Sequence, residues 1–129
     1  MAQKFIRFLP PLVWMVLIFI VSSVPDLPSN KVDALDFFIK KTAHFLEYTF
    51  LFLLWYRALG EKNPTRAIII SLIYSFTDEI HQLFVPGRTG MLRDVGIDAS
   101  GIIITSLLIV KFNLWKRLIS PPPSKKHAR

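Results

Sequence analysis

The chain has 129 residues, of which 52% are hydrophobic, and it carries a formal net charge of +7 at pH 7. A chain of this length forms one domain at most, and a mean hydropathy of +0.43 is too high for an ordinary soluble fold of that size. The absence of cysteine excludes a disulfide framework, thiol chemistry and thiolate metal ligands. The basic residues lie mostly in short segments beside apolar runs, which indicates a membrane surface rather than nucleic acid as the partner.

Four apolar segments approach the roughly 17–25 residues that a membrane-spanning helix needs. They cover residues 8–24, 42–59, 67–85 and 95–110. We therefore predict an all-α fold, an integral membrane four-helix bundle over residues 1–118, followed by a disordered basic tail at 119–129. The second and fourth segments are short or interrupted by charge, so a buried helix of a soluble bundle is the alternative for these two.

The loops between the segments predict an orientation. If the helices alternate in direction, eleven Lys and Arg fall on the side of the two termini and five on the opposite side. Both termini are therefore predicted to be cytoplasmic, because cytoplasmic loops carry the excess of basic residues. A mostly polar external loop is expected after the first helix, to about Lys40. The alternative for the first segment is a cleaved signal peptide, although Pro25 and the length of the run favour a retained helix.

Ionisable residues interrupt the second and third segments near their predicted external ends. His44 and Glu47 lie on one face of the second helix, one turn inward of Lys40 and Lys41. On the third helix, the α-helical period gives two neighbouring polar stripes, one with Tyr74, Asp78 and His81 and the other with Ser75, Glu79 and Gln82. A charge inside a spanning helix costs roughly 2.5–3.5 kcal/mol, so such residues indicate a functional site.

The fourth segment continues this pattern, because the short link PGRTGMLR makes the third and fourth helices an antiparallel hairpin. It begins with Arg93 and Asp94, and a stripe of Asp98, Gly101 and Thr105 permits close helix contact. We predict one polar pocket on the external side, formed by His44, Glu47, Asp78, Glu79, Arg88 and Asp94. Five carboxylates and four cations crowd at this depth, so we expect one carboxylate to stay protonated or His44 or His81 to become charged.

Three stretches resemble the VanZ-like family of bacterial membrane proteins, named for an accessory teicoplanin-resistance protein. They are SSVPDLP after the first helix, KTAHFLEYTFLFLL in the second, and TDEIHQLFVPGRTGMLRDVGIDASG across the third and fourth. The family pattern D-E-x-x-Q-x-F-x-P-G-R, followed by D-x-x-x-[ND]-x-x-G, falls on Asp78, Glu79, Gln82, Phe84, Pro86, Gly87, Arg88, Asp94, Asp98 and Gly101. The pattern K-x-x-H-x-x-x-Y falls on Lys41, His44 and Tyr48.

The resemblance covers about residues 10–110. It implies a multi-pass protein of the bacterial cell membrane, a role at the cell envelope and, for the name-giving member, reduced sensitivity to a glycopeptide antibiotic. It supplies no reaction. The chain has Asp98 where many members have Asn, which adds a charge at that position.

The pocket predicts binding of, or action on, an amphipathic envelope molecule such as an anionic lipid or a lipid-linked sugar. In this hypothesis the candidate catalytic residues are His44, Glu47, Asp78 and Glu79. The candidate ligand-binding residues are Lys41, Gln82, Arg88, Arg93, Asp94 and Asp98. Whether the protein is an enzyme stays open at this point.

Three alternatives compete with this hypothesis. The first is a non-catalytic accessory protein, whose buried charges are structural and whose outer face docks a protein partner. The second concerns single residues: Arg88 pairs with Asp94 rather than a ligand, and Asp98 serves packing with Gly101. The third is a divalent metal site formed by His44, Glu47, Asp78 and His81, the weakest of the three, so no cofactor or metal is expected.

Overall fold

The computed structural model describes residues 6–25, 34–60 and 64–112. Within these ranges the fold is all-α and contains no strand. Its helices are α2 (Leu9–Ser22), α3 (Ala34–Ala58), α4 (Pro64–Gln82) and α5 (Leu92–Phe112). The predicted all-α fold with four helices is therefore confirmed, and the predicted tail at 119–129 lies outside the described residues.

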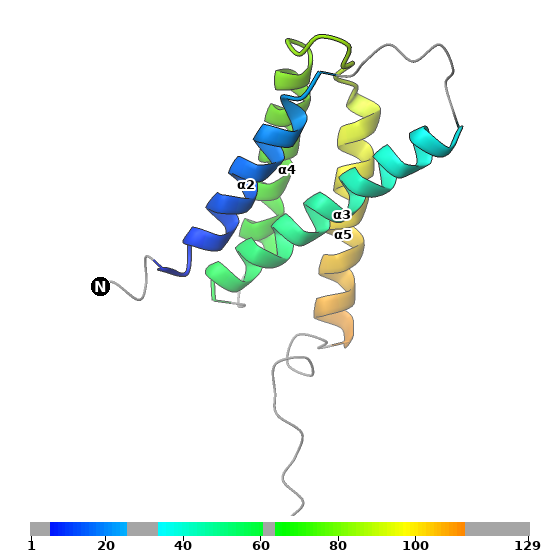
Figure 1. Ribbon diagram of the computed structural model, residues 1–129. Coiled ribbons are helices and arrows are strands. Elements are labelled where there is room, and N and C mark those ends of the chain that lie inside the picture. The colour runs from blue at the N-terminus through cyan, green and yellow to red at the C-terminus, as the bar shows by residue number, and fades with distance from the viewer. Residues whose placement is uncertain (1–5, 26–33, 61–63, 113–129) are drawn as a thin grey trace, which may run out of the picture.

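The helices form a bundle in which α3 crosses the others at a steep tilt (Figure 1). α3 packs on α2, α4 and α5, and α4 packs on α2 and α5. The chain runs upward in α2, downward in α3, upward in α4 and downward in α5, in the view of Figure 1. The described start of α2 and the end of α5 consequently lie at one end of the bundle, and the α4–α5 turn lies at the other.

Proline and glycine mark most of the helix ends. Pro10 stands in the first turn of α2, where backbone N–H groups lack partners within the helix, and Pro64 begins α4 for the same reason. Gly87 adopts a φ of 78°, a left-handed conformation that glycine accepts without strain, in the turn after α4. These residues fix where the α4–α5 hairpin turns.

The start of α3 corrects one prediction. The sequence analysis assigned residues up to about Lys40 to an external loop, but the helix begins at Ala34. No glycine or proline interrupts residues 34–58, and Leu35, Phe38 and Ile39 are exposed on the added turns. The charged pair Lys40 and Lys41 suggested a boundary, yet lysine is a good helix former and the helix continues through it.

Apolar side chains cover the bundle, and acidic side chains lie inside it. Leu12, Val16 and Leu17 of α2 and Leu107 of α5 are among many large exposed hydrophobic residues. The buried residues include Asp78, Glu79, Asp94 and Asp98. Soluble proteins rarely show either feature, whereas in a membrane a helix bundle exposes apolar side chains to hydrocarbon and turns any charged ones inward. By length and hydropathy, α5 is the one described helix able to cross a membrane, and α2 is a shorter apolar helix.

The interior divides into an apolar half and a polar half, joined at Gly101. The apolar half is a cluster centred on Leu51, Phe52, Ile102 and Ile109. A Cβ atom on Gly101 would lie 2.7 Å from the carbonyl oxygen of Phe45 and 2.8 Å from Oγ1 of Thr49. The missing side chain therefore lets α5 approach α3 closely, as the small-residue stripe predicted.

Candidate functional site

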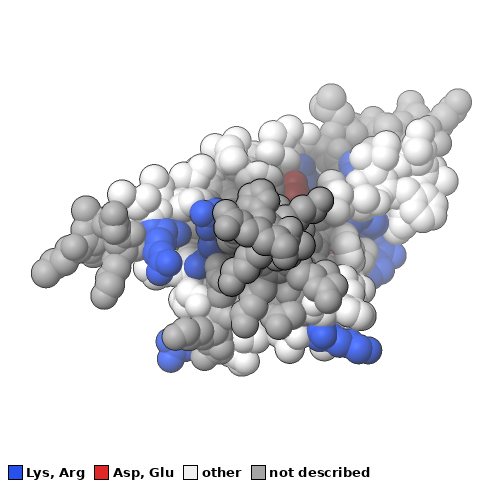
Figure 2. Space-filling model, turned by 90° about the horizontal axis from the view of Figure 1, so that it is seen from below, with Lys and Arg blue, Asp and Glu red and all other residues white. Residues whose placement is uncertain are grey.

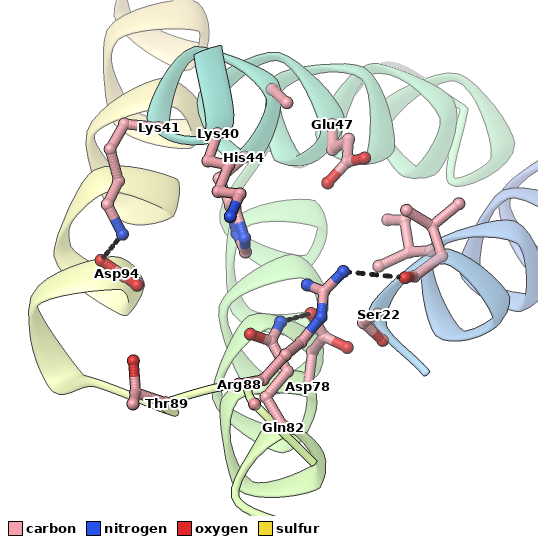
Figure 3. Close-up of a pocket in the computed structure, with 14 residues that line it drawn as sticks. Ser22, Lys40, Lys41, His44, Glu47, Asp78, Gln82, Arg88, Thr89 and Asp94 are labelled. Atoms are coloured by element: carbon pink, nitrogen blue, oxygen red, sulfur yellow. Dashed lines mark hydrogen bonds and ion pairs between the residues drawn. The ribbon is translucent and has the colours of Figure 1, made fainter. Parts of the chain in front are cut away.

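A cavity of about 210 Å³ opens between α2, α3, α4 and the α4–α5 turn. Figure 3 shows polar side chains from each of these elements around it. Its walls include residues predicted from the sequence, namely Lys41, His44, Glu47, Asp78, Gln82, Arg88 and Asp94. Ile18, Val21 and Ser22 of α2 complete one side. The cavity thus combines charged, polar and apolar walls.

The structure brings together five of the six residues predicted to converge, because Glu79 is missing from the cavity wall. Glu79 of α4 and Asp98 of α5 are buried in the interior near His44 of α3, and neither lines the cavity. Arg93 lies outside, with 60% of its side chain exposed. The predicted set therefore separates into cavity residues, a buried pair and one surface arginine.

Asp94 is the anionic end of an ion pair that links two helices at the mouth of the cavity. Lys41 Nζ lies 2.5 Å from Asp94 Oδ1, which joins the outer part of α3 to the start of α5. Arg93 Nε lies 3.8 Å from the same oxygen, and its guanidinium carbon lies 5.4 Å from the centre of the Phe37 ring. Lys41 and Arg93 therefore share one carboxylate.

Arg88 bonds to the end of α2 rather than to Asp94, and its predicted contact with an anionic ligand stays a prediction. Its Nε donates to the carbonyl oxygen of Val24 at 2.9 Å, and Nη2 donates to that of Val21 at 3.0 Å. The last carbonyls of a helix lack partners within the helix and carry partial negative charge, which a guanidinium satisfies. Arg88 therefore ties the α4–α5 turn to the end of α2 while it lines the cavity (Figure 3).

Asp78 presents one satisfied and one unsatisfied oxygen. Its Oδ2 accepts hydrogen bonds from Tyr48 OH at 3.1 Å and from Gln82 Nε2 at 3.0 Å. Its Oδ1 is buried without a hydrogen-bond partner. Because buried polar atoms are nearly always paired, this oxygen, carried by a residue of the cavity wall, is a candidate contact for a bound group.

Behind the wall, two carboxylates are each held by one hydrogen bond. Ser75 Oγ donates to Asp98 Oδ2 at 2.6 Å, and the backbone N–H of Met91 donates to Glu79 Oε2 at 2.9 Å. His44 Nδ1 lies 3.4 Å from Asp98 Oδ1, too far for a strong hydrogen bond. His44 therefore reaches from the cavity wall toward the buried pair.

His81 does not join this group. Its Nε2 lies 2.9 Å from Ser23 Oγ, and its ring stacks on Phe19 with 4.4 Å between ring centroids. Tyr74, on the same stripe of α4, donates a hydrogen bond to the carbonyl oxygen of Met15 at 2.5 Å. Because His81 contacts α2, it does not join His44, Glu47 and Asp78 in the predicted metal set.

Sequence reasoning missed the contribution of α2 and of two hydrogen-bond donors. Ser22 lies at the end of an otherwise apolar helix, and this polar residue could have indicated that α2 forms one wall of the cavity. The hydroxyl of Tyr48 belongs to the second-helix pattern, but its partner Asp78 lies 30 residues away. The Met91 donor is a backbone group, for which no residue type gives a signal.

Comparison with known proteins identifies the family. A family model described as VanZ/LLP1 matches residues 4–116, most of the chain. No curated protein and no solved structure matches the chain. The matched range includes all the residues of the cavity wall and of the buried pair. The chain belongs to the VanZ/LLP1 family.

Proposed function

We propose that the protein is a multi-pass protein of the bacterial cell membrane that binds the anionic headgroup of an amphipathic envelope molecule, a lipid or a lipid-linked sugar, from the extracytoplasmic side. The observation that carries this proposal is that the cavity beside the α4–α5 turn combines cationic side chains with an apolar wall. Lys41 and Arg88 line it together with Ile18 and Val21. Such mixed walls suit a molecule with a charged head and a hydrocarbon tail.

The apolar wall continues onto the outside of the bundle. Val21 lines the cavity and is nevertheless 53% exposed, and its neighbours Phe19 and Ile20 are exposed as well. A ligand whose head lies in the cavity can therefore lay its hydrocarbon chain along α2. A headgroup without such a chain would leave this surface unused.

The cationic wall suits a phosphate or carboxylate. Arg88 uses two of the five N–H donors of a guanidinium on α2 carbonyls, which holds the side chain in place. A guanidinium held in this way is oriented before an anion arrives, and arginine binds phosphate and carboxylate groups through paired hydrogen bonds. Lys41 is held in a similar way by Asp94.

The distribution of charge supports an extracytoplasmic cavity. Figure 2 looks onto the end of the bundle opposite the α4–α5 turn, where Lys and Arg lie around the rim and Asp and Glu hardly show. Arg57 and Lys111 stand in the last turns of α3 and α5 at this end. An excess of basic residues is typical of the cytoplasmic side. The cavity lies toward the other end, beside the α4–α5 turn.

The same cavity offers groups for acid–base chemistry. Asp78 contributes a buried oxygen without a partner, and His44 and Glu47 lie in the same wall. In the catalytic form of the proposal, Asp78 is the base, because its position is fixed by Tyr48 and Gln82. Glu79 then acts as a structural neighbour rather than as a base. An effect on glycopeptide sensitivity would follow from a changed envelope lipid.

An accessory role without catalysis is the second candidate, and a specific observation favours it. Two cationic side chains of the cavity already have partners within the protein, Lys41 with Asp94 and Arg88 with α2. A network of this kind fixes the arrangement of helices by itself. Under this alternative, the outer face of the bundle docks a protein partner and the cavity holds only water.

Co-purified lipid separates the two candidates. We expect mass spectrometry of the protein in mild detergent to find an anionic lipid class enriched over the total membrane extract, and Arg88→Gln to lose that enrichment. Arg66→Gln, an exposed arginine near the start of α4 at the opposite end, is the matched control and should keep it. Identical lipid profiles for all three proteins, with a co-purifying protein instead, would favour the accessory role. Lipidomic comparison of cells with and without the gene then tests turnover.

A further inference from the structure

Three residues that meet behind the cavity each carry a buried atom without a hydrogen-bond partner. The atoms are His44 Nδ1, Glu79 Oε1 and Asp98 Oδ1, and they come from α3, α4 and α5. One potential ligand atom from each of the three residues lies within 4.8 Å of the other two. Buried polar atoms almost always find a partner, so three unpartnered atoms on residues that meet at one place indicate a missing common partner.

The burial of the two carboxylates strengthens this reading. Asp98 is 0% exposed and Glu79 is 5% exposed. Lys41 and Arg93 both pair with Asp94, and among the described residues the ion-pair partner of Asp98 is His44, which is positive only when protonated. Two buried carboxylates this close repel each other, and a neutral His44 gives them no positive charge. A cation between them removes both costs.

The second oxygen of each carboxylate is already fixed. Ser75 Oγ holds Asp98 Oδ2, and the Met91 N–H holds Glu79 Oε2. Metal-binding carboxylates commonly show this arrangement, in which an outer hydrogen bond orients the oxygen that binds the ion. The other oxygens, Asp98 Oδ1 and Glu79 Oε1, are left without a hydrogen-bond partner, and Asp98 Oδ1 lies 3.4 Å from His44 Nδ1.

We propose that His44, Glu79 and Asp98 bind a divalent metal ion. A tetrahedral ion with bonds of about 2.1 Å separates its ligand atoms by about 3.4 Å. His44 Nδ1 and Asp98 Oδ1 are 3.4 Å apart, so this pair needs no rearrangement, while the remaining atoms close in by small side-chain movements. One imidazole with two carboxylates suits Zn²⁺ or Mn²⁺, and water completes the coordination.

The site has an entry path, because His44 also lines the cavity. An ion held there places positive charge at the inner end of the cavity. Metal binding by the purified protein requires no lipid, however, so its failure would leave the proposed lipid binding untouched, and the reverse also holds.

Metal content and stability test the site in the full chain, purified in detergent without a histidine tag. The protein is stripped with EDTA and then given Zn²⁺ or Mn²⁺ alone. We expect one bound ion per chain by elemental mass spectrometry, and a higher unfolding temperature that EDTA reverses. Glu79→Gln and Asp98→Asn keep the outer hydrogen-bond acceptors, and each should weaken binding by at least ~10-fold.

A histidine pair provides the matched control. His44→Gln should weaken binding, whereas His81→Gln, which changes the histidine that faces α2, should not. Pulsed electron paramagnetic resonance of bound Mn²⁺ should detect coupling to one imidazole nitrogen in the wild type and in His81→Gln. The proposal is overturned if the wild type keeps no stoichiometric ion and gains no stability, or if His81→Gln loses the nitrogen coupling. Should the site variants fail to fold, the wild-type measurements decide alone.

Discussion

The two halves of the interior are held together by different forces. Around Phe52 and Ile102, apolar side chains fill the space between helices. Around Asp78 and Asp98, hydrogen bonds and ion pairs link α3, α4 and α5. If the bundle lies in a membrane, as proposed, burial of apolar surface gives no hydrophobic gain, and the apolar half depends on close packing alone. The polar half fixes which helix faces meet, and it contains the candidate site residues.

The largest effect on stability is expected in the apolar half. Phe52 is fully buried, and Phe52→Ala should lower the free energy of unfolding by about 3 kcal/mol, because the cavity left behind removes packing contacts. Thermal or denaturant unfolding in detergent measures the change. Phe76→Ala, on the exposed face of α4, should change stability by less than about 0.5 kcal/mol. Similar losses for both would mean that the apolar half is not tightly packed.

The second-largest effect on stability is expected at Gly101, where the two halves join. Gly101→Ala places a methyl group against the Phe45 carbonyl and Thr49 Oγ1, and we expect a loss of about 2 kcal/mol as α5 moves away from α3. Gly96→Ala, also in α5, is the control, because a Cβ there meets nothing within 4 Å. Gly96→Ala should be neutral or slightly stabilising, since alanine favours helix. Equal tolerance at both sites would contradict the close α3–α5 approach.

The polar half should respond less to the loss of one donor. Ser75→Ala removes the hydrogen bond to Asp98 Oδ2 and leaves a buried oxygen unsatisfied, which should cost about 1.5 kcal/mol. Ser100 provides the control, since its hydroxyl bonds only to the carbonyl of Ile97 in its own helix. A double-mutant cycle with Asp98→Asn should give a coupling energy for Ser75 and none for Ser100.

The sequence predicted the helices and most of the polar half for one physical reason. Apolar runs and helical phase are local properties, so the depth of His44, Glu47 and Asp78 and their common direction follow from spacing. The hairpin link was short enough to place Asp94 beside α4. The tilt of α3 across α5 could not be predicted in this way, because it depends on contacts between helices rather than on spacing within one helix (Figure 1).

The errors concern partners that local spacing cannot identify. The sequence placed Glu79 and Asp78 in one pocket, but adjacent residues on a helix point about 100° apart, so Glu79 faces the interior. One interpretation paired Arg88 with Asp94, but Arg88 donates to backbone carbonyl groups at the end of α2. Every residue has such a carbonyl, so the residue types at that position do not predict the contact. His81 shares a stripe with Tyr74, and both contact α2 rather than the cavity.

The smallest perturbation tests which end of the bundle faces outward. Single cysteines at the exposed positions Thr89 and Arg66 lie at opposite ends, and each should change stability by less than about 0.5 kcal/mol. Gly90 would be a poor position, because a Cβ there collides with the carbonyl oxygen of Glu79.

In intact cells, a membrane-impermeant thiol reagent should label Thr89→Cys and not Arg66→Cys until the membrane is opened. Since the chain has no native cysteine, any label reports the introduced one. Labelling of Arg66→Cys alone would place the polar half of the interior on the cytoplasmic side, and the proposed ligand would then have to be a cytoplasmic lipid headgroup.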